Sequence, residues 1–165
     1  METERKPKLY LITGHTGAGK STICKKMRDS LPAFYLSHDQ LLVQAYGNLI
    51  DTLDFKWCCD QMDGLIWQQA KQLKVFNVDI VLEGYGVRSL RDGVKTSAEQ
   101  LGYDYELIWV SCPVDERWRR VQHRNEDLKG EGYFTDEADF YRMEEANEEL
   151  YEDEVATYID NSTKI

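Results

Sequence analysis

The chain has 165 residues, of which 42% are hydrophobic and 12% aromatic, so it can bury a core and lacks the composition of a disordered protein. Its formal net charge of −10 argues against an extended nucleic-acid-binding surface, which needs clustered Lys and Arg. No apolar run approaches the roughly 20 residues that span a bilayer, and the N-terminus has no apolar signal segment, so we expect a cytoplasmic protein with no membrane partner.

Strand-like and helix-like segments alternate along the chain. Apolar runs predict strands over residues 9–13, 33–37, 79–84 and 105–111, and "TYID" at 157–160 could add a fifth. Apolar periodicity and proline positions predict helices over 20–31 and 55–73, and a further helix opened by Pro113. Nearly continuous apolar strands suit a parallel sheet covered on both faces. The sequence therefore predicts one three-layer α/β domain over residues 1–165.

The acidic C-terminal part predicts a last helix. Apolar residues lie on one helical stripe, namely Phe140, Met143, Leu150, Tyr151 and Val155. We expect this helix to bury the stripe and to turn its many acidic side chains toward solvent.

A glycine-rich turn, "GHTGAGKS" at 14–21, follows the first strand and enters the first helix. It fits the phosphate-binding pattern G-x-x-x-x-G-K-[ST], in which glycines let backbone N–H groups face phosphate oxygens. Lys20 would reach the β- and γ-phosphates, and Ser21 would hold Mg²⁺. We predict ATP and Mg²⁺ as cofactors. The predicted nucleotide-binding residues are Gly14, His15, Thr16, Gly17, Ala18, Gly19, Lys20, Ser21 and Thr22, with His15 as a contact residue rather than a catalyst.

The fate of the phosphate depends on what else the chain carries. A GTPase switch should contain a guanine-reading Asn-Lys-x-Asp stretch, which is missing here. A mechanical ATPase needs a sensor region and an arginine finger, for which 165 residues leave little room. Transfer to an acceptor molecule is the remaining interpretation.

Asp39 comes just after the second strand, where open α/β sheets form their ligand crevice. A carboxylate there can accept the proton of an attacking hydroxyl. Alternatively, Asp39 caps a helix over 40–45, and both roles are compatible.

Glu83 ends the third predicted strand, beside the glycine-rich turn. An acid at this place can hold Mg²⁺ directly or through water, so Ser21 and Glu83 are the predicted metal-binding residues. The alternative is an ordinary acid at a strand end.

The helix after Pro113 carries Arg117, Arg120 and Arg124 on one face. Stacked like charges repel unless an anion or acidic side chains lie between them. Triphosphate is one such anion, and Glu116 or the acidic last helix is the alternative, to which we assign Arg117.

Two further arginines, Arg88 and Arg91, follow the third strand. They could lie near an acceptor or phosphates, or be surface charges. Trp57, Trp67, Tyr46 and Tyr85 could line an acceptor pocket, but at helical spacing we expect both tryptophans in the core.

The glycine-rich turn, the strand ending in Ser-x-Asp and the following "AYG" resemble the small P-loop kinases. These include chloramphenicol phosphotransferase, the zeta toxins, the 5′-kinase domain of polynucleotide kinase and bacterial ATP-binding proteins of unassigned substrate. The likeness continues through "IWQQAKQL", "VDIVLEGYGVRSLRD", "CPVDERWRRVQHRN" and "GEGYFTDEADFYRMEEANEELYEDE", and covers roughly residues 8–154. It departs at Gln40, where the last group often has Glu.

This resemblance implies a five-stranded parallel sheet of order 2-3-1-4-5, with Asp39 as general base. It also implies a lid around 124–134, with Arg120 and Arg124 as lid arginines that match R-x-x-x-R-N. The expected function is ATP- and Mg²⁺-dependent transfer of the γ-phosphate to a hydroxyl of a small molecule, with Asp39, Lys20, Arg120 and Arg124 as catalytic residues. The alternatives are a 5′-hydroxyl kinase of nucleotides or short nucleic acid, and a non-enzymatic ATP-binding module.

Overall fold

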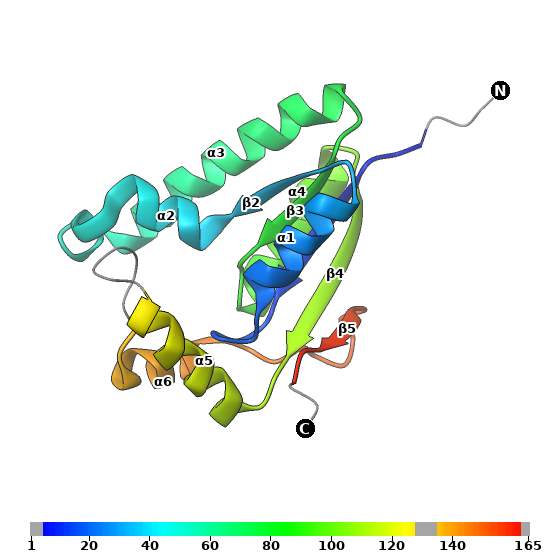
Figure 1. The fold of residues 1–165 in the computed structure, drawn as a ribbon. Helices are drawn as coiled ribbons and strands as arrows, with labels where there is room; N and C mark the ends of the chain where they lie inside the picture. Colours follow the sequence, from blue (N-terminus) through cyan, green and yellow to red (C-terminus); the bar gives the residue numbers. More distant parts are fainter. Residues whose placement is uncertain (1–4, 128–134, 163–165) are drawn as a thin grey trace.

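The structure, a computed structural model, describes residues 5–127 and 135–162. Its centre is a parallel sheet of five strands in the order β2-β3-β1-β4-β5, as predicted (Figure 1). The strands are β1 (Lys8–Thr13), β2 (Ala33–Ser37), β3 (Asp79–Glu83), β4 (Asp104–Ser111) and β5 (Thr157–Asp160). The "TYID" stretch is therefore a strand, paired in parallel with β4.

Helices connect the strands. They are α1 (Lys20–Ser30), α2 (His38–Tyr46), the 3₁₀ helix η1 (Gly47–Asp51), α3 (Phe55–Val75), α4 (Arg88–Gln100), α5 (Val114–Asp127) and α6 (Glu137–Ala146). No helix among the described residues is both long enough and apolar enough to cross a membrane. The expected lid around 124–134 is described only as far as the end of α5, because residues 128–134 lie outside the described ranges.

Apolar side chains cover both faces of the sheet, which explains the continuous apolar runs. On one face Leu9 and Leu11 of β1 join a buried cluster with Ile66 of α3 and Val94 of α4. On the other face Ile12 packs in a second cluster with residues of α1. Alternate residues of each strand thus serve opposite layers, and the predicted three-layer architecture is confirmed.

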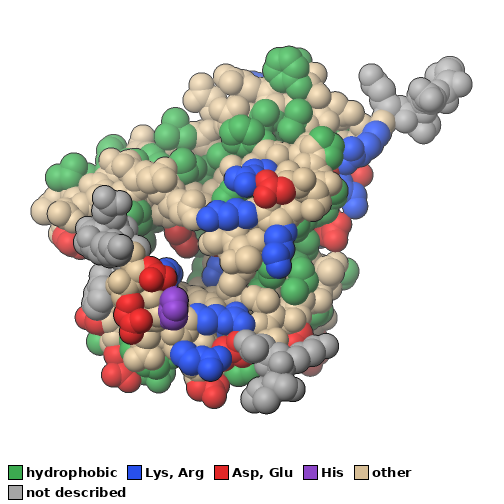
Figure 2. All heavy atoms as spheres, viewed as in Figure 1, with side chains coloured by type: hydrophobic (Ala, Val, Ile, Leu, Met, Phe, Trp, Pro, Cys, Tyr) green, Lys and Arg blue, Asp and Glu red, His purple; other side chains and the backbone are tan. Residues whose placement is uncertain are grey.

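The carboxyl ends of the parallel strands gather at one edge of the sheet. From this edge the chain runs into α1, α2, α4 and α5, and α6 lies close by (Figure 1). Figure 2, drawn from the same side, shows the surface hollowed between the α2–α3 part and the α5–α6 part. Ligands of open α/β sheets bind at such an edge, so the candidate site is located by topology alone.

The predicted last helix is shorter than expected. Helix α6 begins after Asp136, whose Oδ1 accepts from the backbone N of Asp139 at 2.8 Å, and it ends at Ala146. Residues 147–156, called the strap below, contain no helix and run on to β5. The strap leaves the helical path because Glu148 N donates to Gly86 O at 3.0 Å. As a result Val155 is 93% exposed instead of sharing a buried stripe with Phe140.

Candidate active site

The glycine-rich turn has a backbone that only glycine can adopt at several points. The φ angles of Gly14, Gly17 and Gly19 are 140°, 80° and 93°, in the region that side chains disfavour. A Cβ on Gly17 would lie 2.5 Å from the carbonyl oxygen of Arg117, and one on Gly14 would lie 2.3 Å from that of Val110. The turn therefore packs against β4 and α5, and its shape fits a phosphate cradle at the N-terminus of α1.

Lys20 is folded back over this turn. Its ammonium donates to the carbonyl oxygens of Gly14 at 2.8 Å and His15 at 2.9 Å. Burial lowers the pKa of Lys20, while the nearby charges of Glu83 and Asp39 oppose the decrease. The ammonium thus stands in the cradle, within the electrostatic range of both predicted acidic site residues.

Ser21 and Glu83 meet, as a shared metal site requires. Ser21 Oγ donates to Glu83 Oε1 at 2.7 Å, and Glu83 is only 6% exposed. The other carboxylate oxygen accepts from the hydroxyl of Tyr35 on β2. A hydroxyl and a carboxylate at the phosphate cradle are oxygen ligands of the kind Mg²⁺ prefers, so these residues fit the ion.

The role of Tyr35 was not predicted from the sequence. Its partner Glu83 lies 48 residues further along the chain, on β3. The contact between Tyr35 and Glu83 can be expected only once β2 is known to pair with β3. The alternation of side chains between the two faces of β2 could have indicated this contact. Tyr35 is in register with Val81, so it lies on the same face of the sheet as Glu83, which is two residues after Val81.

Asp39 does not cap α2. The cap is Ser37, whose Oγ accepts from the backbone N of Gln40 at 3.4 Å, and α2 already begins at His38. The side chain of Asp39 is 76% exposed, with Oδ1 3.5 Å from His38 Nδ1. Loss of surrounding water raises the pKa of Asp39, but the contact with His38 and the charge of Lys20 lower it more. The net direction is downward, so the carboxylate is ionised at neutral pH.

A second polar cluster lies behind Asp39, and of its members only Tyr85 was considered from the sequence, as a possible lining residue of an acceptor pocket. It consists of His38, Asp63 and Tyr85, from α2, α3 and the turn after β3. The hydroxyl of Tyr85 donates to Asp63 Oδ1 at 2.5 Å, and His38 Nε2 lies 3.6 Å from the same oxygen. Burial lowers the pKa of His38, but Asp39 and Asp63 raise it more, so it lies above its ordinary value. We call these three residues the acceptor-side cluster.

Tyr85 has an unusual backbone. Its φ is 63°, which is rare for an aromatic residue, and it follows Gly84 at 134°. Its carbonyl accepts from Thr13 Oγ1 at 3.2 Å, which ties the turn to β1. A strained backbone conformation of this kind persists where the surrounding structure holds it in place. Here it directs the ring of Tyr85 toward His38, with 5.2 Å between the two ring centroids.

The three arginines predicted to share one face of α5 have different partners. Arg117 is 5% exposed and its guanidinium binds both carboxylate oxygens of Glu144 in α6, which confirms the assignment made from the sequence. Arg120 binds Glu116 Oε1 at 2.5 Å and the carbonyl oxygen of Asn161 at 2.6 Å. Its other terminal nitrogen lies 3.4 Å from Ala18 O, so it borders the glycine-rich turn.

Arg124 differs from the other two. Within residues 5–127 and 135–162 its recorded hydrogen-bond partner is a neutral group, Thr135 Oγ1 at 3.0 Å. Arg124 is therefore the α5 arginine best able to accept a phosphate without breaking an ion pair.

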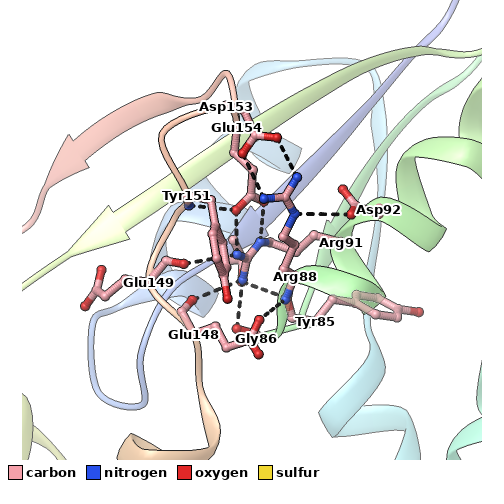
Figure 3. A network of polar contacts seen from close by, with 11 residues as sticks. Tyr85, Gly86, Arg88, Arg91, Asp92, Glu148, Glu149, Tyr151, Asp153 and Glu154 are labelled. Carbon is pink, nitrogen blue, oxygen red and sulfur yellow. Dashed lines mark hydrogen bonds and ion pairs between the residues drawn. The ribbon is translucent and has the colours of Figure 1, made fainter.

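Arg88 and Arg91 bind the strap (Figure 3). Arg91 is 1% exposed, and Nε and Nη2 each bind one carboxylate oxygen of Glu154 at 2.7 Å. Its remaining donors reach three carbonyl oxygens, of Gly86 at 2.8 Å, Glu148 at 3.1 Å and Glu149 at 3.2 Å. Arg88 binds Asp153 with two hydrogen bonds, at 2.8 and 2.6 Å. Arg91 is thus a buried structural residue, and its interpretation as a surface charge was wrong.

Two acids of the C-terminal part depart from the expected solvated helix face, whereas others, such as Glu145 and Glu152, are exposed as expected. Glu144 and Glu154 both pair with buried arginines, and these contacts hold their pKa values below the ordinary range of glutamate. His15 also turns toward this part: Nε2 lies 2.9 Å from Glu149 Oε1 and Nδ1 3.0 Å from Glu144 Oε2, the latter without hydrogen-bond geometry. Trp57 is a further correction, because it is 50% exposed rather than in the core, whereas Trp67 packs against the core.

A parallel sheet of this order, with a Gly-x-x-x-x-Gly-Lys-Ser turn between β1 and α1 and an acid at the end of β3, defines a small P-loop kinase. The model of a family described as an AAA domain matches residues 9–150, and the chain belongs to this family. The resemblance seen in the sequence is thereby confirmed.

Known proteins agree with this class. The shikimate kinase of Corynebacterium glutamicum is 30% identical over 153 residues, which cover 91% of this chain and 84% of that protein. A sugar kinase from Janibacter sp. HTCC2649 has the same fold, with a TM-score of 0.68 at 16% identity over 94% of this chain and 86% of that one. One chain of the Pnkp1/Rnl/Hen1 RNA repair complex gives a TM-score of 0.67 at 21% identity, over 86% of this chain and 44% of its own length.

Proposed function

We propose that this P-loop kinase transfers the γ-phosphate of ATP, with Mg²⁺, to a hydroxyl group of a small molecule. The observation that carries the proposal is the convergence of Lys20, Glu83 and the exposed carboxylate of Asp39 at one edge of the sheet. Lys20 interacts electrostatically with both acids, so a phosphate bound in the cradle would lie next to a hydroxyl bound beside Asp39. The shikimate kinase relative supports a hydroxyl acceptor.

Each side chain has a defined task in this reaction. The glycine-rich turn and Lys20 bind the phosphates and hold the γ-phosphate toward Asp39. Ser21 and Glu83 would hold Mg²⁺, which would neutralise part of the negative charge that develops on the phosphates. Asp39 orients the acceptor hydroxyl and takes its proton. Because the transition state of phosphoryl transfer is loose, an ionised carboxylate of lowered pKa suffices for this task.

Two arginines complete the proposed machinery. Arg124 is held by a neutral hydroxyl, and it can turn to the transferred group at small electrostatic cost. Arg120 must exchange its contacts with Glu116 and Asn161 for contacts with the phosphates, although it already borders Ala18 of the cradle. We therefore assign charge neutralisation to both, with Arg124 as the residue that acts without losing an ion pair.

The substitution Asp39→Asn tests the proposal, because it removes the proton acceptor and keeps the size of the side chain. We expect ATP affinity to change less than about threefold and transfer to hydroxyl acceptors to fall by about a hundredfold or more, the scale of a lost general base. Calorimetric ATP binding and single-turnover transfer of labelled γ-phosphate measure the two quantities. Asp60→Asn, at an exposed position of α3, is the control. Transfer that survives per bound ATP would contradict the role of Asp39.

A second candidate is a 5′-hydroxyl kinase of nucleotides or short nucleic acid, which the similarity to the RNA repair complex favours. The net charge of −10 disfavours it. A short oligonucleotide with a free 5′-hydroxyl distinguishes the two: a salt-sensitive affinity and labelling of its 5′ end would support this candidate. If ATP binds but no acceptor of either kind is phosphorylated in a single turnover, the chain is an ATP-binding module.

A further inference from the structure

Resting on the proposed function, we propose that the acceptor is an uncharged polyhydroxyl compound, and that Asp63 of the acceptor-side cluster selects against acceptors bearing a carboxylate or a phosphate. The side chains around Asp39 are mainly acidic, and most of the nearby arginines are already bound to carboxylates.

The protein wall next to Asp39 is acidic. Residues 38–66, which form α2, η1 and the first half of α3, contain five aspartates, one lysine and no arginine. The lysine, Lys56, is 82% exposed at its side chain and pairs with Asp60 at 2.6 Å. Of the five acids, Asp39 and Asp63 both flank the buried ring of His38. An anionic group that enters here meets like charges, which disfavour its binding.

The arginines around this edge cannot easily compensate. Of those described there, Arg88, Arg91, Arg117 and Arg120 are each bound to a carboxylate. Removing the partner from a buried arginine is strongly unfavourable, so Arg91 and Arg117 are committed to the fold. Lys20 and Arg124 carry no such bond in the described part of the chain, but the proposed reaction uses both for the phosphates of ATP. An anionic acceptor would therefore compete with ATP for its cations.

The acceptor-side cluster instead matches hydroxyl groups. Ionised carboxylates accept hydrogen bonds from O–H donors without requiring a charge on the ligand. Asp63 is fixed by the hydroxyl of Tyr85 and remains 31% exposed at its side chain, while Asp39 is 76% exposed. Two carboxylates that flank the same imidazole can bind neighbouring hydroxyls of one molecule. Burial lowers the pKa of His38, but these acids raise it more, which favours a positive charge on the imidazole between them.

Acceptors that differ only at one carbon test the charge preference. Gluconate, glucitol and 1-amino-1-deoxyglucitol carry an acid, an alcohol and an amine on the same skeleton, and glycerate, glycerol and 3-amino-1,2-propanediol form a second series. We measure kcat/KM for γ-phosphate transfer, corrected for ATP hydrolysis. In each series that is phosphorylated, we expect the alcohol to exceed the acid by about tenfold or more, which is the effect of a like charge near a protein surface. Preference for the acid would overturn the inference and leave the proposed kinase activity intact, and preference for the amine would overturn the statement that the acceptor is uncharged.

Asp63→Asn tests the residue itself. We expect the acid-to-alcohol ratio of kcat/KM to rise by about tenfold with an unchanged ATP dissociation constant, because the substitution removes one of the two charges beside His38. Asp60→Asn, three residues earlier on α3 and paired with Lys56, should leave the ratio unchanged. An unchanged ratio in Asp63→Asn would overturn the role of Asp63. If no member of either series is phosphorylated although ATP binds and another hydroxyl acceptor is phosphorylated, the inference is wrong and the proposed kinase activity stands.

Discussion

The nucleotide side and the acceptor side of the site are built differently. On the nucleotide side, formed by the glycine-rich turn, α5, α6 and the strap, Arg91 and Arg117 are 1% and 5% exposed and bound to carboxylates. On the acceptor side, formed by α2, η1 and the start of α3, the apolar residues Leu49, Phe55 and Trp57 are 56%, 58% and 50% exposed. Buried ion pairs hold the first side in place, whereas the second side leaves apolar side chains exposed to solvent.

This difference indicates where specificity resides. A cradle whose backbone is already formed binds triphosphate with side-chain exchanges alone, such as those of Lys20 and Arg120, and this cradle is common to P-loop proteins with many acceptors. Loosely covered segments can rearrange around the second substrate, as expected of elements at the low-stability end of a protein. Substitutions on the nucleotide side should therefore affect stability and ATP use, and those on the acceptor side the choice of substrate.

The largest expected effect lies in the strap. Arg91→Leu leaves Glu154, with a side chain 7% exposed, without its partner, so we expect a loss of about 3–5 kcal/mol in the free energy of unfolding. Arg88→Leu is the matched control, because its partner Asp153 is 67% exposed, and it should cost much less than Arg91→Leu. Urea denaturation measures both. Equal losses would mean that the strap contributes no more than a surface ion pair.

The next effect concerns Lys20. In Lys20→Ala no other side chain of the cradle can reach the β- and γ-phosphates, so we expect transfer to fall by at least about a hundredfold, or roughly 3 kcal/mol of transition-state stabilisation. Single-turnover transfer from labelled ATP measures it, with Lys25→Ala on the exposed face of α1 as control. A rate within threefold of the unsubstituted protein would contradict the phosphate-cradle interpretation.

A smaller effect should appear at Tyr35, a positioning residue for Glu83. Tyr35→Phe removes the hydrogen bond to Glu83 Oε2, worth about 1–1.5 kcal/mol. We expect the Mg²⁺ concentration for half-maximal ATP binding to rise about five- to tenfold, measured by calorimetry at several Mg²⁺ concentrations. Tyr10→Phe on β1 should leave it unchanged. A Tyr35→Phe protein that needs no more Mg²⁺ would show that Ser21 alone orients Glu83.

The smallest expected effect is a dependence of stability on pH. The pKa values of Glu144 and Glu154 are lowered in the fold by Arg117 and Arg91, so the unfolded chain binds more protons in the acid range. The stabilisation is complete above the ordinary glutamate pKa of about 4.3 and disappears as the pH falls through the lowered values. We expect a loss on the order of 1 kcal/mol as the pH falls from about 5 to about 3. Glu154→Gln should flatten this dependence, and an unaltered slope would exclude Glu154 as a source.

Much of the nucleotide side could be predicted from the sequence. The pattern from Gly14 to Ser21, the acid at Glu83 and the strand boundaries depend on local order along the chain, and the structure places them together. The strand order came from the resemblance to P-loop kinases rather than from periodicity. The identity of the acceptor leaves no such local pattern, because it depends on contacts among α2, α3 and the turn after β3.

The errors have a common physical cause. Tyr35 and Asp63 act through partners on other elements, 48 and 22 residues away, which periodicity cannot reveal. The last helix was extended too far because its apolar spacing continued, while Gly86 and Arg91 offered its backbone other hydrogen bonds. Arg91 was assigned to a ligand or to the surface because a charged side chain is rarely buried without a visible partner in the sequence.

The strap also determines when the protein can complete its folding during synthesis. Arg91 leaves the ribosome long before Glu148, Glu149 and Glu154, which follow it by 57 to 63 residues and supply most of its partners. Until those residues emerge, α4 carries a cation that cannot be buried, so the helix cannot dock fully beside β4. A ribosome that stalls before Glu154 therefore holds an immature chain with an exposed sheet face, which chaperones and proteases can recognise.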